Sequence, residues 1–308
     1  MTLVYKANAA RGLAWKRIQA ERAPDLAFRI WPDIGDPAAV RYLAAWHPPE
    51  RPGETFPNLE IAFSVGAGVD HFDAATLPPH VPLVRMVEPG LVDAMVEYVT
   101  LAVLALHRDL VAYVDQQRRE VWKEIVIRPA RERRVGILGL GQLGQPAALR
   151  LRELGFRVSG WSRSGATLDG VEGFAGAESL PAFLGAVDIL VCLLPLTEST
   201  RGILDRTLFA RLPAGASLVN VGRGGHLVAA DLVEALDSGH LSAAILDVAE
   251  PEPPPAGHPF WRHPKILLTP HVASTSRVED AVDFVLDTIR RHRDGRPLLG
   301  LVDRARGY

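Results

Sequence analysis

The chain has 308 residues, of which 48% are hydrophobic, so it is long enough to bury one large core or two smaller ones. Its 34 basic and 36 acidic residues leave a formal net charge of -2, which argues against nucleic acid or an anionic membrane as the main partner. The single cysteine, Cys192, excludes an internal disulfide and lies in the apolar run VDILVCLLPL, which indicates a buried thiol in a reducing compartment.

Residues 1–100 contain short apolar segments separated by many prolines. The chain begins without a continuous apolar segment, and its longest uninterrupted apolar runs stop short of about 18 residues. We therefore expect neither a signal peptide nor a membrane span, and a cytoplasmic location. The candidate strands are LAFRIWPDI, YLAAWHPP, LEIAFSVGAGVD and VPLVRMV. They predict a small α/β domain.

Two helical patterns flank the larger part of the chain. Residues 91–122 have the apolar spacing of one long helix or two helices in series. Residues 277–295, RVEDAVDFVLDTIRRHRDG, form an amphipathic helix pattern that comes after the last candidate strand. The chain is therefore expected to return to the small domain. The predicted domains are 1–98 with 278–308, and 99–277.

From residue 134 onward, short apolar runs alternate with helical patterns. The runs include RVGILGL, VDILVCLLPL, SLVNVG, AAILDVA and KILLTP. Continuous apolar strands separated by amphipathic helices predict a parallel sheet that is covered by helices on both faces. We expect a doubly wound α/β domain here.

The clearest motif is GLGQLG, which places Gly139, Gly141 and Gly144 in GxGxxG spacing between a strand and a helix. The first glycine permits a tight turn, the second lets a pyrophosphate approach the backbone, and the third lets helix and strand pack closely. The turn, with Gln142 and Leu143, is therefore predicted to bind a dinucleotide at the helix N-terminus. An adenosine site of the methyltransferase kind, or a turn without a ligand, is the alternative.

The segment after the second strand of this domain bears on the choice of cofactor. An NAD-selective site places Asp or Glu there to bind the ribose 2'-hydroxyl. This chain instead has Ser162, Arg163 and Ser164, which offer hydroxyl groups and a guanidinium suited to a 2'-phosphate. We therefore predict NADPH, with NADH as the alternative. Arg163 could also stack on adenine without selecting either cofactor.

Two charged or titratable residues lie where ligand chemistry is expected. Arg223 lies on the glycine-rich turn NVGRGG, where a guanidinium can bind a carboxylate and polarise a carbonyl that gains negative charge. His271, in LTPHVAS, follows an apolar strand and so lies at the carboxyl edge of the sheet. Taken alone, such an arginine is more often a surface charge, and a lone histidine is more often structural.

The order and spacing of several segments resemble the D-isomer specific 2-hydroxyacid dehydrogenase family over nearly the whole chain. The segments are SVGAGVDH, MVEYVTLAVLAL, GLGQLG, LPLTESTRGIL, NVGRGG, LDVAEPEPPP and LTPHVAS. AAWHPP near the start and GLVDRARGY at the end are most similar to the glyoxylate/hydroxypyruvate reductase A branch. The resemblance implies two Rossmann-like domains: a doubly wound dinucleotide-binding domain and a smaller, discontinuous, flavodoxin-like substrate domain. Substrate and nicotinamide would meet in the cleft between the domains.

The resemblance assigns catalytic roles to Arg223, Glu252 and His271. His271 would donate a proton, while Glu252 would stabilise the imidazolium and fix the orientation of the ring. Glu250 is a nearby competitor. The family glutamate stands five residues after an aspartate, here Asp247, and directly before a proline, which selects Glu252.

The resemblance also implies the groups that bind the ligands. Backbone N–H groups of residues 65–68 would form a nest for the substrate carboxylate, with Trp46 as a wall of the pocket. The nest residues are Val65, Gly66, Ala67 and Gly68; the further cofactor-binding residues are Leu194, Pro195, Val221 and Asp247. Two residues in the loop that carries Glu252 depart from the family pattern: Ala249 and Pro254.

We therefore predict a reductase that converts a small 2-keto acid, glyoxylate or hydroxypyruvate, to the D-2-hydroxy acid. No metal is implied, because the named residues lack the spacing of a metal site. A homodimer is expected, with contacts from the helical segment between Ala94 and Trp122 and the arm after it. The alternatives are a family member acting on another substrate, of the D-lactate, phosphite or formate type, and a non-catalytic, dinucleotide-sensing, corepressor-like protein.

Overall fold

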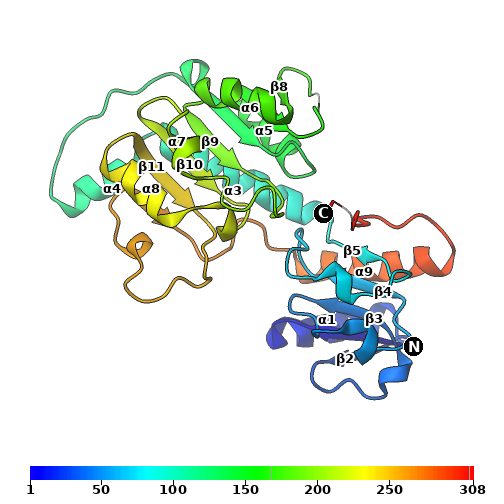
Figure 1. Cartoon of the computed structure of the whole chain (residues 1–308). Helices are drawn as coiled ribbons and strands as arrows, with labels where there is room; N and C mark the ends of the chain where they lie inside the picture. Colours follow the sequence, from blue (N-terminus) through cyan, green and yellow to red (C-terminus); the bar gives the residue numbers. More distant parts are fainter. Residues whose placement is uncertain (167, 305) are drawn as a thin grey trace. The chain divides into compact units, whose positions relative to one another are not determined.

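The computed structural model describes residues 1–166, 168–304 and 306–308, which form two compact units (Figure 1). Unit 1 comprises Met1–Leu91 and Thr275–Tyr308, and unit 2 comprises Val92–Ser274. The boundaries predicted from the sequence lie a few residues further along the chain. At the first boundary, helix α3 (Pro89–His107) is continuous and buries side chains such as Val99 and Val103 in the core of unit 2.

Unit 1 is built on a parallel five-stranded sheet with the order β2-β1-β3-β4-β5. Its strands are β1 (Thr2–Lys6), β2 (Ala27–Ile30), β3 (Val40–Ala45), β4 (Ile61–Ser64) and β5 (Leu83–Val84). Its helices are α1 (Ala9–Arg22), α2 (Pro52–Thr55) and α9 (Val278–Arg293). This strand order is that of flavodoxin-like folds, which confirms the predicted fold class of the small domain.

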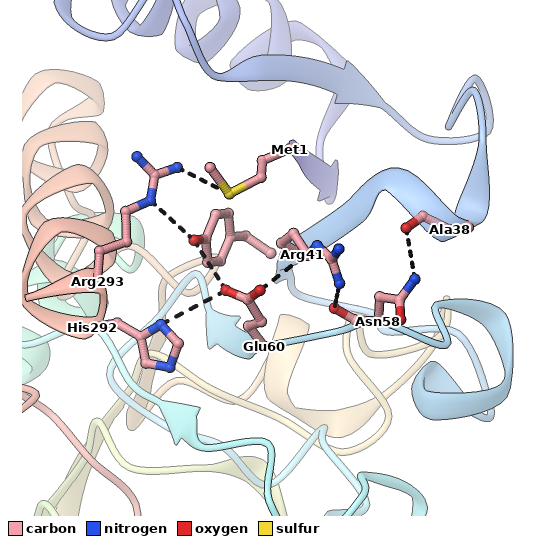
Figure 2. A network of polar contacts seen from close by, with 8 residues as sticks. Met1, Ala38, Arg41, Asn58, Glu60, His292 and Arg293 are labelled. Carbon is pink, nitrogen blue, oxygen red and sulfur yellow. Dashed lines mark hydrogen bonds and ion pairs between the residues drawn. The ribbon is translucent and has the colours of Figure 1, made fainter. Parts of the chain in front are cut away.

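Helix α9 comes from the C-terminal end of the chain and completes unit 1. Its apolar residues recur at helical spacing, and they pack with Trp15 and Ile18 of α1 in one core. They are Ala281, Val282, Val285, Leu286 and Ile289. Figure 2 shows polar contacts at the end of this helix, where Glu60 lies between His292 and Arg41. The return of the chain to the small unit is thus held by both apolar and polar contacts.

Unit 2 is built on a parallel seven-stranded sheet with the order β12-β11-β10-β9-β6-β7-β8. Its strands are β6 (Arg134–Leu138), β7 (Arg157–Ser162), β8 (Glu172–Ala175), β9 (Ile189–Cys192), β10 (Ala216–Asn220), β11 (Leu241–Leu246) and β12 (Ile266–Leu268). Its helices, besides α3, are α4 (Leu110–Arg118), α5 (Gly144–Glu153), α6 (Gly176–Gly185), α7 (Arg206–Phe209) and α8 (Ala229–Asp237).

Helices cover both faces of this sheet. In β9, Ile189 and Val191 pack in one core with side chains of α3 and α5, whereas Leu190 and Cys192 pack in the other with side chains of α6, α7 and α8. Strands that are buried on both faces explain the continuous apolar runs in the sequence. The predicted doubly wound domain is confirmed, and so is the buried thiol, because Cys192 is fully buried in this core. This burial raises the pKa of the Cys192 thiol to about 12.

Helix α3 bears on the prediction that the chain has no membrane span. That prediction rested on the length of uninterrupted apolar runs, yet α3 is long and apolar enough, by length and composition, to cross a membrane. Met95, Val99 and Leu106 nevertheless pack into the core of unit 2. A core helix of this kind meets the same criterion, so the feature is weak evidence for a membrane span.

Candidate active site

The carboxyl ends of the unit 2 strands form an edge with a reversal of strand order. From β6 the chain proceeds to β7 and β8 on one side of the sheet, and then to β9 on the other side. Gly139 follows β6 and Leu193 follows β9, and the N–H of Leu193 donates to the carbonyl oxygen of Leu138 over 2.8 Å. In open α/β sheets, ligands bind at such a switch point.

The three glycines of the GxGxxG turn have different surroundings. Gly139 has φ of 105°, and a β-carbon there would lie 2.8 Å from the carbonyl oxygen of Leu193. A β-carbon at Gly144 would lie 1.9 Å from the carbonyl oxygen of Gly139, whereas one at Gly141 would meet none of the described atoms within 4 Å. The chain's own packing therefore requires Gly139 and Gly144. Gly141 leaves open space at the N-terminus of α5, where a pyrophosphate would approach.

The turn after β7 lies beside this motif, because β7 pairs with β6 and Trp161 is opposite Leu138. The hydroxyl oxygen of Ser162 accepts hydrogen bonds from the N–H groups of Gly165 (3.1 Å) and Ala166 (2.9 Å), which closes the turn. The hydroxyl proton of Ser162 can still be donated to a ligand. Arg163 and Ser164 are exposed on the same turn.

The turn that carries Arg223 is fixed by a buried side chain that the sequence analysis did not single out. Asn220 accepts a hydrogen bond from the N–H of Gly222 (3.2 Å) and donates one to the carbonyl oxygen of Arg223 (3.1 Å). The N–H of Arg223 donates to Nδ1 of the buried His226 (3.0 Å). Hydrogen bonds to both its carbonyl oxygen and its N–H group thus fix the backbone of Arg223. In the sequence, the role of Asn220 could have been inferred from its place at the end of the apolar run SLVN.

This turn packs against the loop after β11. A β-carbon at Gly224 would lie 2.0 Å from the carbonyl oxygen of Ala249, so the close contact requires glycine. Leu194 and Val221, which follow β9 and β10, are buried at the same edge of the sheet, and Pro195 follows Leu194. The Ala249 backbone, rather than a large side chain, makes the contact between the two loops.

His271 and Glu252 are in direct contact. Nδ1 of His271 lies 2.7 Å from Oε1 of Glu252, and both side chains are partly exposed. Glu250 instead pairs with Arg201, whose Nη1 lies 3.4 Å from each of its carboxylate oxygens. Of the two candidate glutamates, Glu252 is therefore the partner of His271.

Asp247, which the resemblance assigned to the cofactor, is almost fully buried and contacts the protein itself. Its carboxylate accepts hydrogen bonds from the hydroxyl of Thr269 (2.6 Å) and from the N–H groups of Val272 (2.9 Å) and Ala273 (2.8 Å). These contacts hold the loop that carries His271. A carboxylate offers about four acceptor positions, so about one remains for a ligand.

In unit 1, two of the four N–H groups predicted to form the anion nest are already used. The N–H of Val65 donates to the carbonyl oxygen of Ala45 (3.2 Å), and that of Gly66 donates to the hydroxyl of Ser64 (3.2 Å). The described part of the chain shows no such partner for the N–H groups of Ala67 and Gly68. The predicted nest therefore has fewer N–H donors than expected, because the pairing of Val65 with Ala45 and the bond of Gly66 to Ser64 use two of the four.

Trp46 packs directly on this loop. A β-carbon at Gly66 would lie 2.7 Å from Cζ3 of Trp46, so glycine leaves room here for the indole. The indole also stacks on His71, with 4.4 Å between the ring centroids. His71 ends the SVGAGVDH motif, and no role was predicted for it from the sequence.

The fold and the glycine-rich turn define a two-unit α/β protein whose larger unit is a Rossmann-type dinucleotide-binding domain. Residues 100–273 match the model of the D-isomer specific 2-hydroxyacid dehydrogenase, NAD binding domain. The whole chain is 40% identical over 314 residues to a glyoxylate/hydroxypyruvate reductase A of Yersinia enterocolitica, with both chains fully covered. The chain belongs to the D-isomer specific 2-hydroxyacid dehydrogenase family.

Two solved structures resemble the whole chain. One is a D-isomer specific 2-hydroxyacid dehydrogenase from Xanthobacter autotrophicus in complex with NADPH and MES; it has 42% identity and a TM-score of 0.94, with 100% of this chain and 99% of that chain covered. The other is an NADPH-dependent glyoxylate/hydroxypyruvate reductase from Sinorhizobium meliloti in complex with NADP and sulfate; it has 38% identity and a TM-score of 0.93, with the same coverage. The similarity thus extends over both units.

Proposed function

We propose that this protein uses NADPH to reduce a small 2-keto acid, glyoxylate or hydroxypyruvate, to the corresponding D-2-hydroxy acid. The observation that carries the proposal is the 2.7 Å contact between Nδ1 of His271 and Oε1 of Glu252, at the strand edge that also bears the glycine-rich turn. A histidine that is held by a carboxylate is well suited to donate a proton to a carbonyl oxygen as it is reduced. Family membership and the reductase relatives support the same reaction.

The proposed chemistry divides between the cofactor and two side chains. When bound at the glycine-rich turn, NADPH would supply the hydride that reduces the carbonyl carbon. The carbonyl oxygen takes a proton from Nε2 of His271, because Nδ1 is engaged by Glu252, and the C=O bond becomes C–OH. Arg223 stabilises the negative charge that develops on this oxygen and binds the substrate carboxylate. His271 then regains a proton from solvent.

The residues around the turn after β7 support NADPH as the cofactor. No carboxylate lies between residues 162 and 166, so the carboxylate that would repel a 2'-phosphate is missing from this turn. Ser162, Arg163 and Ser164 supply two hydroxyls and one guanidinium. Relatives with 42% and 38% identity hold NADPH and NADP in their crystal structures.

We further propose that the substrate carboxylate is bound by the N–H groups of Ala67 and Gly68. Trp46, which packs against Gly66, would limit the pocket to small acids. A pocket bounded by an indole suits substrates of two or three carbons, such as glyoxylate and hydroxypyruvate. Homodimerisation in the cytoplasm is part of the same proposal.

The experiment is a steady-state assay of the purified protein with each reduced cofactor and a panel of 2-keto acids. Glyoxylate, hydroxypyruvate and pyruvate are the essential members, with formate and phosphite tested in the oxidative direction. The His271→Ala variant is the control, because turnover by this site requires the acid, which contributes about 10² to 10⁴ in rate. Preference for pyruvate, formate or phosphite would indicate another family substrate. Dinucleotide binding without any turnover would indicate a non-catalytic sensor.

A further inference from the structure

The backbone of His271 is in an unusual conformation. Its φ is 55°, in the left-handed region that residues other than glycine seldom occupy. Its N–H donates to the carbonyl oxygens of Asp247 (2.8 Å) and Thr269 (3.1 Å). Because φ sets the direction of the Cα–Cβ bond, the place of the imidazole depends on this turn being held. Such conformations persist only where the surrounding contacts enforce them.

The turn is enforced by the buried carboxylate of Asp247. On one side of His271, the hydroxyl of Thr269 donates to Oδ1 of Asp247 over 2.6 Å. On the other side, the N–H groups of Val272 and Ala273 donate to the two carboxylate oxygens over 2.9 and 2.8 Å. Residues on both flanks of His271 are thus tied to a single carboxylate.

A further hydrogen bond extends this network to α3. The hydroxyl of Tyr98 lies 2.5 Å from Oγ1 of Thr269. Thr269 has one hydroxyl proton and gives it to Asp247, which only accepts when ionised, so Thr269 must accept from Tyr98. Burial raises the pKa of Tyr98, which keeps the phenol protonated and able to donate. The chain therefore runs in one direction, from Tyr98 through Thr269 to Asp247.

We infer that Tyr98 is a positioning residue for His271, acting through Thr269 and Asp247. The Tyr98 hydroxyl fixes the Thr269 hydroxyl in the orientation that donates to Oδ1. Without it, Thr269 can rotate toward other acceptors, and one of the anchors of the His271 turn is lost. Among the hydrogen bonds described, the Tyr98 hydroxyl bonds to Thr269, and the imidazole of His271 bonds to Glu252. Its effect on turnover rests on the proposed function, whereas its effect on the imidazole does not.

The test uses the full chain with isotope-labelled histidine, so that the imidazole is observed independently of turnover. The His271→Gln variant identifies the His271 resonances. In Tyr98→Phe and Thr269→Val we expect these resonances to shift and kcat to fall about tenfold, with the Kd for NADPH unchanged. In Thr269→Ser, which keeps the hydroxyl, the His271 resonances and kcat should stay near wild type. The variant that combines Tyr98→Phe with Thr269→Val should have a kcat no lower than either single variant, because both substitutions break one chain of hydrogen bonds.

The matched control is Tyr42→Phe, which removes a hydroxyl from a fully buried tyrosine of unit 1 that contacts Glu60 over 3.3 Å. It should leave the His271 resonances unchanged. Wild-type resonances in both Tyr98→Phe and Thr269→Val would overturn the inference, even if the two variants lose stability. Shifted resonances in a protein that turns over no keto acid would retain the inference and reject the proposed function.

Discussion

Oε1 of Glu252 lies 2.7 Å from Nδ1 of His271, while Glu250, two residues earlier, pairs with Arg201. Under the proposed function, the Glu252 carboxylate holds the orientation of the imidazole that donates the proton. We expect Glu252→Gln, which removes the charge and keeps the shape of the side chain, to lower kcat for keto-acid reduction. The measurement is kcat with saturating NADPH and keto acid.

The matched control for this change is Glu250→Gln, which removes the same charge from the same loop but has no contact with His271 among those described. Its kcat should stay near that of the wild type. Equal kcat values for wild type and Glu252→Gln would remove Glu252 from the catalytic unit. A larger fall in kcat for Glu250→Gln than for Glu252→Gln would exchange the roles of the two glutamates.

The glycine-rich turn offers a test that separates ligand binding from folding. A β-carbon at Gly141 would meet none of the described atoms within 4 Å, so Gly141→Ala should leave the unfolding free energy within about 0.5 kcal/mol of wild type. The methyl would occupy the space needed by the pyrophosphate, so the KM for NADPH should rise by about tenfold or more. Thermal unfolding and cofactor titration measure the two quantities.

Gly144→Ala is the comparison, because its β-carbon would lie 1.9 Å from a backbone oxygen. We expect it to destabilise the protein as well as weaken cofactor binding, since the backbone of Gly139 must move. Equal effects of the two substitutions on stability would contradict the different roles that the structure gives these glycines. Normal NADPH affinity in Gly141→Ala would place the pyrophosphate elsewhere.

The extent to which the sequence predicted the fold depends on how each strand is buried. β9 and β10 are buried throughout and were visible as continuous apolar runs. β8, EGFA, lies at the edge of its sheet and is mostly exposed, so it gave no apolar signal and was missed. β1, TLVYK, is central and buried, but Thr2 and Lys6 flank its three apolar residues, and it was also missed. Hydrophobic patterns record burial, whereas strand order depends on contacts distant in sequence.

The candidate site shows a similar division. The residues of the glycine-rich turn follow from local spacing, because each glycine has a local geometric task. The roles of Asn220 and Ser64 could not be read in this way, since each side chain binds the backbone of its own turn and the turn geometry decides which atoms meet. The same competition removed Val65 and Gly66 from the predicted nest. The partners of backbone N–H groups in a turn can be assigned only once the path of the backbone is known.

A partly buried ion pair in unit 2, between Asp188 and Arg134, makes stability depend on pH. Burial alone would raise the pKa of Asp188, but hydrogen bonds from the side chain and the N–H of Arg134 outweigh this, and the pKa is lowered. A carboxyl with a lowered pKa stabilises the fold above its unfolded pKa of about 3.9, and this contribution is lost as pH falls below that value. Asp188→Asn should therefore reduce stability at pH 7 by about 1–2 kcal/mol and flatten the acid side of the curve.

Urea unfolding between pH 7 and pH 3 measures this difference. Asp287→Asn is the control, because Asp287 also has a pKa lowered by a hydrogen bond, from Arg291, but lies on the surface. Its effect should stay within about 0.5 kcal/mol. If the unfolding free energies of Asp188→Asn and wild type differed by the same amount at every pH, the Asp188–Arg134 pair would contribute nothing to the pH dependence of stability.

The proposed homodimer has a candidate surface on α3, at the start of α4 and on the segment after α4. The large apolar side chains that are exposed there are Leu101, Leu104, Leu110, Val121, Trp122, Val126 and Ile127. A patch of this kind marks an interaction surface in many proteins. We expect Leu101→Glu to shift the protein to a monomer in light scattering at micromolar concentration. Leu154→Glu, which alters an exposed leucine of unit 2 next to α5, should stay dimeric. A wild-type monomer would exclude the proposal.

The preference for NADPH is expected to depend on Arg163, which is exposed on the turn after β7. A guanidinium suits a phosphate dianion and has no comparable partner in the 2'-hydroxyl of NADH. Arg163→Ala should therefore lower kcat/KM for NADPH by about tenfold or more and leave that for NADH nearly unchanged. Arg152→Ala is a matched control, because Arg152 belongs to α5 and pairs with Asp169. Equal losses with both cofactors in Arg163→Ala would indicate stacking on adenine instead of phosphate recognition. A wild-type preference for NADH would reject the role given to this turn.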